Sequence, residues 1–185
     1  MRVLAISGSL RADSNSTALL RAAREEAPEG VDVILWDGLK AIPPYDQDDD
    51  VVPGPTTVAA FRELVREVDA VFFATPEYNS SVPGALKNAL DWASRPVATN
   101  VFRNKPVAVV SSSAGAFGGV WAAAELRKVL SAMGARVTEA ELSVGHAHEK
   151  LDENGRLVDD DVRQGLREAL ETLLAEINSR VEVAA

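Results

Sequence analysis

The chain has 185 residues, a formal net charge of −9 and no cysteine. The absence of cysteine excludes disulfides, thiolate metal sites, iron–sulfur clusters and a cysteine nucleophile. The acidic balance argues against nucleic acid, which binds basic surfaces, and no apolar run reaches the roughly 18 residues that a membrane span needs. The N-terminus is too quickly polar for a secretory signal. We therefore expect one cytoplasmic domain over residues 1–185, with a frayed tail from about Ser179.

Short apolar runs alternate along the chain with segments that show helical spacing. Four of these runs are continuous, which indicates parallel strands buried on both faces; they cover residues 3–6, 33–36, 70–74 and 107–110. A more polar fifth strand, containing Leu142 and Val144, is expected at a sheet edge. Helices are predicted over residues 58–68, 85–92, 121–133 and 162–177. The alternation predicts a doubly wound α/β sandwich.

The longest break in this pattern is Asp37–Pro55, which contains four prolines and the acidic run Asp48–Asp50. Loops of this length are usually functional or mobile. The acidic run could indicate a divalent metal, but a solvated loop is the simpler interpretation, and we expect no metal.

The loop after the first predicted strand is rich in short polar side chains. They are Ser9, Ser14, Asn15, Ser16 and Thr17. Beside a helix N-terminus such donors favour a phosphate, and Arg11 adds a cation with the geometry to bind one. Helix capping is the alternative interpretation, but a cap needs only one of these residues. The sequence therefore predicts a phosphate site.

This loop matches neither G-x-G-x-x-G nor G-x-x-x-x-G-K-[ST]. An NAD-type Rossmann enzyme and a P-loop NTPase are both disfavoured for that reason. Asp37, which follows the second strand, is accordingly interpreted as a turn residue and not as a ribose ligand.

Two further loops should lie beside the first, because the carboxyl ends of parallel strands meet at one edge of the sheet. After the third strand comes Pro76-Glu77-Tyr78-Asn79-Ser80. It offers a stiff backbone, a flat ring and an amide that both donates and accepts, which a heterocycle with a uracil-like edge needs. After the fourth strand comes a glycine-rich loop with Ser113 and Gly115, where backbone can approach a ligand closely.

Three motifs in these loops resemble the NADPH-dependent FMN reductase family, whose members include quinone, azo-dye and chromate reductases. They are Gly-Ser-Leu-Arg-x-x-Ser from Gly8, Pro-Glu-Tyr-Asn-x-x-x-Pro-Gly-x-Leu-Lys-Asn-x-x-Asp-Trp from Pro76, and Ser-x-Gly-x-x-Gly-Gly from Ser113. The second motif is the most specific. The resemblance extends over nearly the whole chain, from Arg2 to Leu173.

The resemblance implies a flavodoxin-like fold, with a five-stranded parallel sheet of order 2-1-3-4-5 and FMN bound without a covalent link. It implies that the FMN phosphate lies among Ser9, Arg11, Ser14 and Ser16, and the composition of the loop adds Asn15 as a candidate. The isoalloxazine would lie along Pro76, Glu77, Tyr78, Asn79 and Ser80, mostly against their backbone, with Ser113 and Gly115 on its other side. Ser16 departs from the family pattern, which usually has asparagine there.

The implied activity is a ping-pong reduction in which NAD(P)H reduces the flavin and a small acceptor then reoxidises it. Quinones are the leading acceptors, with azo dyes, chromate and free flavin as further ones. No catalytic side chain is needed, and His146 and His148 are expected at the surface. The resemblance also implies a homodimer or homotetramer, with residues 85–92 and 37–55 contributing to the interface.

Two other functions remain as alternatives on the same fold. An electron-carrier flavodoxin would also be acidic, but the first loop lacks the threonine-rich phosphate pattern of those carriers. A receiver-type signalling domain would need acidic residues after the first and third strands, where this chain has Ser7-Gly8 and Thr75-Pro76. We therefore favour the reductase.

Overall fold

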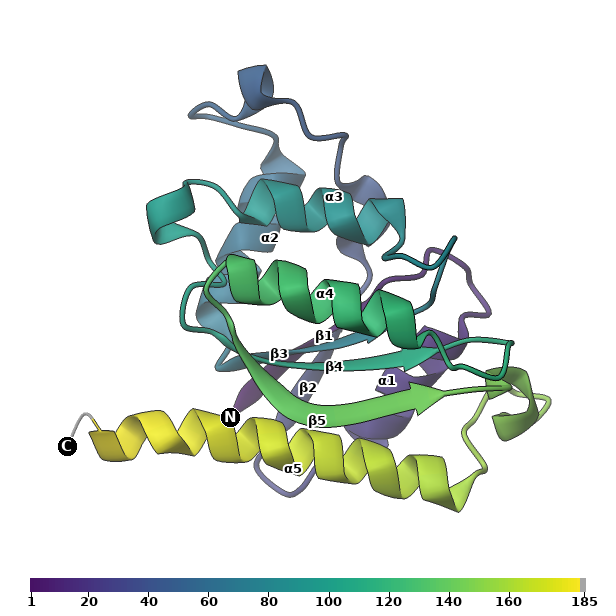
Figure 1. The fold of residues 1–185 in the computed structure, drawn as a ribbon. Coiled ribbons are helices and arrows are strands. Elements are labelled where there is room, and N and C mark those ends of the chain that lie inside the picture. The colour runs from purple at the N-terminus through teal and green to yellow at the C-terminus, as the bar shows by residue number, and fades with distance from the viewer. Residues whose placement is uncertain (184–185) are drawn as a thin grey trace.

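The computed structural model describes the backbone of residues 1–183 and the side chains of residues 1–179 (Figure 1). Its strands are β1 Arg2–Ser7, β2 Asp32–Trp36, β3 Ala70–Thr75, β4 Pro106–Ser112 and β5 Arg136–Val144. Its helices are α1 Asn15–Glu25, α2 Thr56–Glu67, α3 Gly84–Ala93, α4 Val120–Ala132 and α5 Asp160–Val183. Short 3₁₀ turns, which the sequence did not predict, are η1 Gly38–Ala41, η2 Gln47–Asp49, η3 Val97–Thr99 and η4 Ala147–Lys150.

All five strands are parallel and follow the order β2-β1-β3-β4-β5. This confirms the predicted flavodoxin-like topology and the edge position of the fifth strand. Helix α5 continues past Ser179 to Val183. The remainder of the tail that we expected to fray, residues 184–185, lies outside the described residues.

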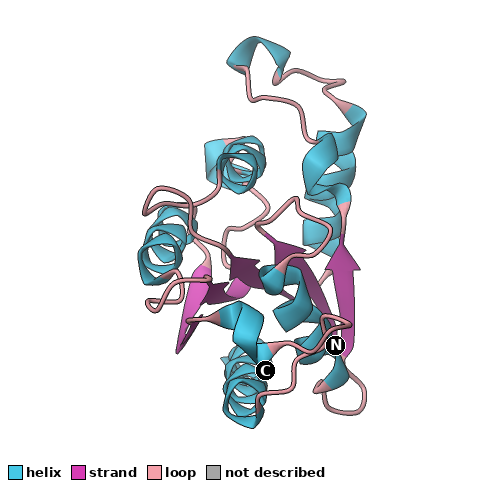
Figure 2. Ribbon diagram, turned by 90° about the vertical axis from the view of Figure 1, so that its right-hand side faces the viewer, coloured by secondary structure: helices cyan, strands magenta, loops and turns pink. Residues whose placement is uncertain are grey.

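Helices cover both faces of the sheet, so the central strands are buried on both sides (Figure 2). On one face, Leu4, Phe73 and Val109 pack with α2, α3 and α4. On the other, Ala5 and Phe72 pack with α1 and α5. Neighbouring residues of one strand thus enter different cores, which explains why the apolar runs in the sequence are continuous rather than alternating.

A register shift between Val107 and Val109 interrupts the pairing of β4 with β5. Arg127 of α4 donates to carbonyl oxygens beside it, at 2.6 Å from Thr138 and 3.3 Å from Val109, and it also donates to Ala140. The guanidinium therefore satisfies carbonyl groups that a regular ladder would have paired.

The loop between β2 and α2 projects beyond α2 and α3 (Figure 1) and is tied to the body by side chains of α3. Asn88 Nδ2 and Trp92 Nε1 both donate to the Pro43 carbonyl at 2.8 Å. Within the acidic run, Asp50 accepts a hydrogen bond from Arg62 at 2.9 Å, whereas Asp48 and Asp49 are exposed. The loop is therefore held at its base and open at its tip.

Candidate functional site

The loops after β1, β3 and β4 meet at the carboxyl end of the sheet, as the sequence predicted. Gly8 fixes the closest approach: its N–H donates to the Ala74 carbonyl at 2.8 Å. A Cβ at this position would lie 3.0 Å from Leu86 Cδ2 and 3.1 Å from Thr75 Oγ1. Only glycine fits without displacing these neighbours, so the tight turn that begins the first motif serves to bring two loops together.

The N-terminus of α1 presents unpaired donors to this junction. Ser14 caps the helix by accepting from Thr17 N at 3.2 Å, so part of the capping interpretation is correct. Within the described part of the chain, the N–H groups of Asn15 and Ser16 have no acceptor. Two free N–H groups at the positive end of a helix favour an anion there.

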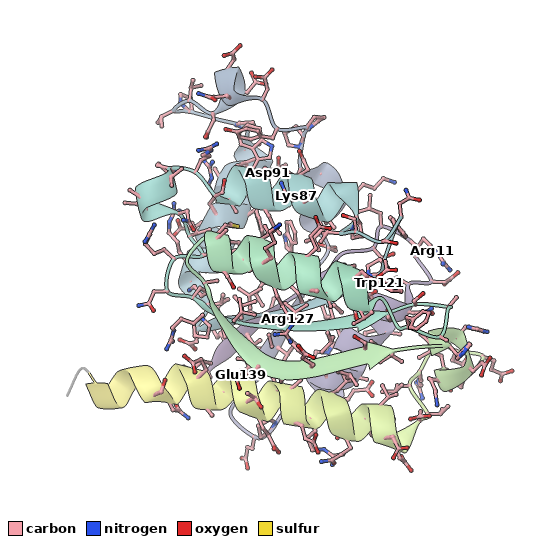
Figure 3. The ribbon with its side chains drawn as sticks, in the orientation of Figure 1. Arg11, Lys87, Asp91, Trp121, Arg127 and Glu139 are labelled. Atoms are coloured by element: carbon pink, nitrogen blue, oxygen red, sulfur yellow. The ribbon has the colours of Figure 1, made fainter. Side chains whose placement is uncertain are left out.

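Arg11 supplies a cation beside these donors. Its Nη2 donates to the Asp13 carbonyl at 3.1 Å, and the side chain extends outward from the β1–α1 loop (Figure 3). Ser9 Oγ accepts from Arg11 N at 3.3 Å, which gives the loop its shape. The cation thus flanks the end of α1 and carries no ion pair within residues 1–179.

Ser16 connects this first loop to the third. It is fully buried, and its Oγ lies 2.9 Å from Ser112 Oγ at the end of β4. When Ser112 is the donor of this pair, the Ser16 hydroxyl proton is free for a ligand. A serine here is therefore part of the framework as well as a candidate ligand, which its place in the sequence alone did not reveal.

The loop after β3 is a tight turn in which Tyr78 and Ser81 exchange backbone hydrogen bonds, each of 3.1 Å. Both central residues have positive φ, 52° at Asn79 and 58° at Ser80, as in a type I′ turn. A serine in this conformation is strained, and such strain concentrates at functional sites. The Ser81 hydroxyl also donates to Glu125 and holds the pKa of that carboxyl below its usual range.

Glu77 joins the second loop to α4. Its Oε2 accepts from the N–H groups of Trp121 and Ala122, both at 3.1 Å. Helix α4 needs this partner because its own cap, Gly119, has no side chain to offer. The negative charge lies at the positive end of the helix dipole. The carboxylate is thereby engaged within the protein, whereas the backbone of Glu77 has no hydrogen-bond partner among the residues that the structure describes.

The loop after β4 is held by the segment that follows β5. Ser113 N donates to the Val144 carbonyl at 3.0 Å, and Ala147 N donates to the Ser113 carbonyl at 3.0 Å. Gly118 has φ of +63°, and a Cβ there would lie 2.5 Å from the carbonyl carbon of Ser143. This glycine therefore serves internal packing. The sequence had suggested a different role, namely that it lets the backbone approach a ligand. Gly115 is free of such contacts apart from Ser113 Oγ at 3.6 Å.

Together the three loops surround a pocket of about 230 Å³, called here the central pocket. It is lined by Ser9, Arg11, Ser14, Asn15, Ser16, Pro76, Glu77, Tyr78, Ser112, Ser113 and Ala114. Nine of these residues were predicted from the sequence. Ser112 and Ala114 were missed, although both adjoin Ser113 in the same loop. The predicted residues Asn79, Ser80 and Gly115 do not line the pocket and lie beside it in the chain.

Comparison with known proteins identifies the family of this chain. The family model for NADPH-dependent FMN reductases matches residues 1–149. The chain belongs to this family. An NAD(P)H-dependent FMN reductase of Pseudomonas aeruginosa is 41% identical over 94% of this chain and 93% of its own. An NADPH:quinone oxidoreductase of Arabidopsis thaliana is 40% identical, with 95% and 91% of the two chains covered.

A solved structure with the same architecture is similar to this chain. It is FerB, a flavoenzyme NAD(P)H:(acceptor) oxidoreductase from Paracoccus denitrificans. The two structures agree with a TM-score of 0.86 and are 30% identical, covering 96% of this chain and 97% of FerB. The chain is thus an oxidoreductase of a family that uses FMN and NAD(P)H, and the electron-carrier alternative is not favoured.

The residues of the central pocket suit FMN. A phosphate would find the free N–H groups of Asn15 and Ser16, with Arg11 beside them. The planar ring would find Tyr78 and the unpaired backbone of Glu77. His146 and His148 have half-exposed side chains, as predicted, and lie outside this pocket. Within residues 1–183, no helix is long and apolar enough to cross a membrane.

Proposed function

We propose that the protein is a cytoplasmic NAD(P)H-dependent reductase that holds FMN in the central pocket and reduces quinones or similar small acceptors. The observation that carries the proposal is the junction of α1 with the 76–80 turn. It joins unpaired anion-binding donors to a strained turn with an exposed tyrosine. FMN, when bound, supplies the electron relay between NAD(P)H and the acceptor.

The residues divide into two groups by the chemistry that they offer. Ser9, Arg11, Ser14, Asn15 and Ser16 would bind the phosphate through hydroxyl, guanidinium and helix N–H donors. The turn Pro76–Ser80 would position the ring on one side, mostly by backbone groups, with Ser113 and Gly115 on the other. In this assignment the protein orients the ring and performs no acid–base step, since the Glu77 carboxylate is held by α4 and both histidines lie outside the pocket.

A second copy of the chain would complete the site. Tyr78, Phe117 and Trp121 are 48%, 69% and 49% exposed, and the last two are packed together with ring centroids 5.2 Å apart. Three exposed aromatic side chains beside a ligand pocket favour an interface. This supports a homodimer or homotetramer, with α3 and the 37–55 loop as further parts of the contact.

The phosphate assignment is tested by comparing FMN with riboflavin, which lacks the phosphate. Arg11→Ala should weaken FMN binding about tenfold, the loss of one charge-assisted hydrogen bond, and leave riboflavin binding unchanged. Arg24→Ala removes an exposed cation elsewhere on α1 and serves as the matched control. Equal losses for both flavins would show that Arg11 does not bind the phosphate.

The activity is tested by rapid mixing of the FMN-loaded protein with NADPH in the absence of oxygen. Flavin absorbance should bleach, and a subsequent addition of benzoquinone should restore it. Steady-state rates at several quinone concentrations should give the parallel reciprocal plots of a ping-pong enzyme. A bound flavin that both NADPH and NADH leave oxidised would rule the reductase out.

A further inference from the structure

A second and larger pocket adjoins the central pocket, between α1 and the carboxyl end of β2. Its volume is about 410 Å³, and we call it the β2 pocket. It is lined by Ala5, Ser7, Ser9, Leu10, Arg11, Ala12, Thr17, Leu20, Arg21, Leu35, Trp36, Asp37 and Lys40. Ser9 and Arg11 line both pockets, so the loop containing them is a common wall. A ligand that extends across this loop would contact both pockets.

Three cations converge on this pocket in a chain whose net charge is −9. Besides Arg11 they are Arg21 of α1 and Lys40 of η1, both exposed. Neither Arg21 nor Lys40 has an ion-pair or hydrogen-bond partner among the described side chains. Asp37 is the single carboxylate of the lining. The net charge of the pocket lining is therefore positive, although that of the whole chain is negative. Binding of a polyanion requires such a local positive charge.

The other walls of the β2 pocket are apolar and firmly held. Trp36 is stacked on Phe61 with ring centroids 4.4 Å apart and 15° between the planes. Gly38 covers the indole so closely that a Cβ there would lie 2.6 Å from Trp36 Nε1. Leu20 and Leu35 also line the pocket. Apolar walls with a few convergent polar groups are typical of a site for a heterocycle with a charged substituent.

The position of Arg21 is not explained by the helix dipole of α1. A second group of cations, Arg95, Arg103 and Lys128, lines a pocket beside the C-terminal ends of α3 and α4, where positive charge is favoured in any case. Arg21, in contrast, precedes the last turn of α1. In addition, the β2 pocket, which Arg21 lines, adjoins the central pocket. Both lie at the end of the sheet where ligands bind in this topology.

We propose that the β2 pocket binds the adenosine end of NADPH and that Arg21 and Lys40 bind its 2′-phosphate. The inference rests on the proposed function, since it assigns part of the coenzyme to a place beyond the central pocket. The two cations, which have no partner among the described side chains, would each donate to the phosphate, while the apolar part of the pocket receives the adenine. The chain would then favour NADPH over NADH.

The test measures binding of 2′,5′-ADP and 5′-AMP to the FMN-loaded protein by titration calorimetry. The variant Arg21→Ala/Lys40→Ala should bind 2′,5′-ADP at least about tenfold more weakly than the parent and bind 5′-AMP equally well. Its NADPH-over-NADH ratio in kcat/KM should fall by a similar factor. The control variant Arg24→Ala/Lys128→Ala removes the same charge from exposed positions outside the pocket and should behave like the parent.

Three results would overturn the inference: unchanged 2′,5′-ADP binding in the pocket variant, equal losses for the two nucleotides, or equal losses in the control variant. The last would indicate a general effect of charge. Failure of the proposed function looks different, because the parent protein would then take up no FMN, or neither NADPH nor NADH would reduce the bound flavin. Retention of FMN by the pocket variant keeps the two outcomes separate.

Discussion

Glu77→Ala should lower the stability of the protein and loosen its hold on FMN, while leaving turnover of the loaded enzyme largely intact. The carboxylate accepts two backbone N–H groups of α4 at 3.1 Å each. Loss of a helix cap costs about 0.5–2 kcal/mol, and a partly exposed charged acceptor lies within that range. We expect about 1–2 kcal/mol, which for a domain of this size lowers Tm by roughly 3–6 °C.

The assay is thermal unfolding of the flavin-free protein, followed by FMN titration and by turnover at saturating FMN. Glu77→Gln keeps an acceptor oxygen but loses the charge–dipole attraction, so its Tm should lie between those of the parent and the alanine variant. Glu171→Ala, at an exposed position of α5, controls for loss of a glutamate. An unchanged Tm, or complete loss of turnover with FMN still bound, would refute the capping role.

Three further changes test other parts of the structure. Gly8→Ala places a methyl group 3.0 Å from Leu86 Cδ2; it should cost about 1–3 kcal/mol in urea unfolding and weaken FMN binding. Arg127→Met leaves carbonyl groups at the β5 irregularity unpaired and should cost about 2–4 kcal/mol by the same assay. Hydrogen bonding from Arg163 lowers the pKa of Glu26 in the folded protein. The ionised Glu26 therefore contributes its full stabilisation above the ordinary glutamate pKa of about 4.3. This contribution is lost as the pH falls through the lowered pKa of the folded state. The stability difference between the parent and Glu26→Gln should therefore shrink on acidification, as Tm measured against pH will show.

The sequence predicted the sheet and its layers because four of the five strands are continuous apolar runs. Val107–Val110, for example, is apolar throughout, and only burial on both faces tolerates that. The bounds of β5 were less evident. Glu139 and Glu141 indicated an edge strand but not where it begins, because they lie in a segment with a register shift that Arg127 stabilises. A guanidinium donating to distant carbonyl groups leaves no periodic trace in a sequence.

The site was predictable at the level of loops and less so at the level of single contacts. Motif and topology brought Ser9, Ser14 and Pro76 to one pocket. The engagement of Glu77 with α4 and of Ser16 with Ser112 depends on where two loops touch, 44 or more residues apart in the chain. Such contacts arise from the packed framework, so local sequence patterns do not encode them.

The contact between Ser16 and Ser112 has a consequence for how a cofactor arrives. It fastens the first turn of α1 to the end of β4 within the protein itself, and Glu77 likewise fastens the second loop to α4. The walls are therefore preorganised, and little chain entropy is lost when a ligand settles between them. FMN would bind to and dissociate from a preformed pocket, and the loops would not need to fold around it. The rate of FMN exchange would then be governed by dissociation of the flavin alone. The flavin-free protein would stay folded for long periods.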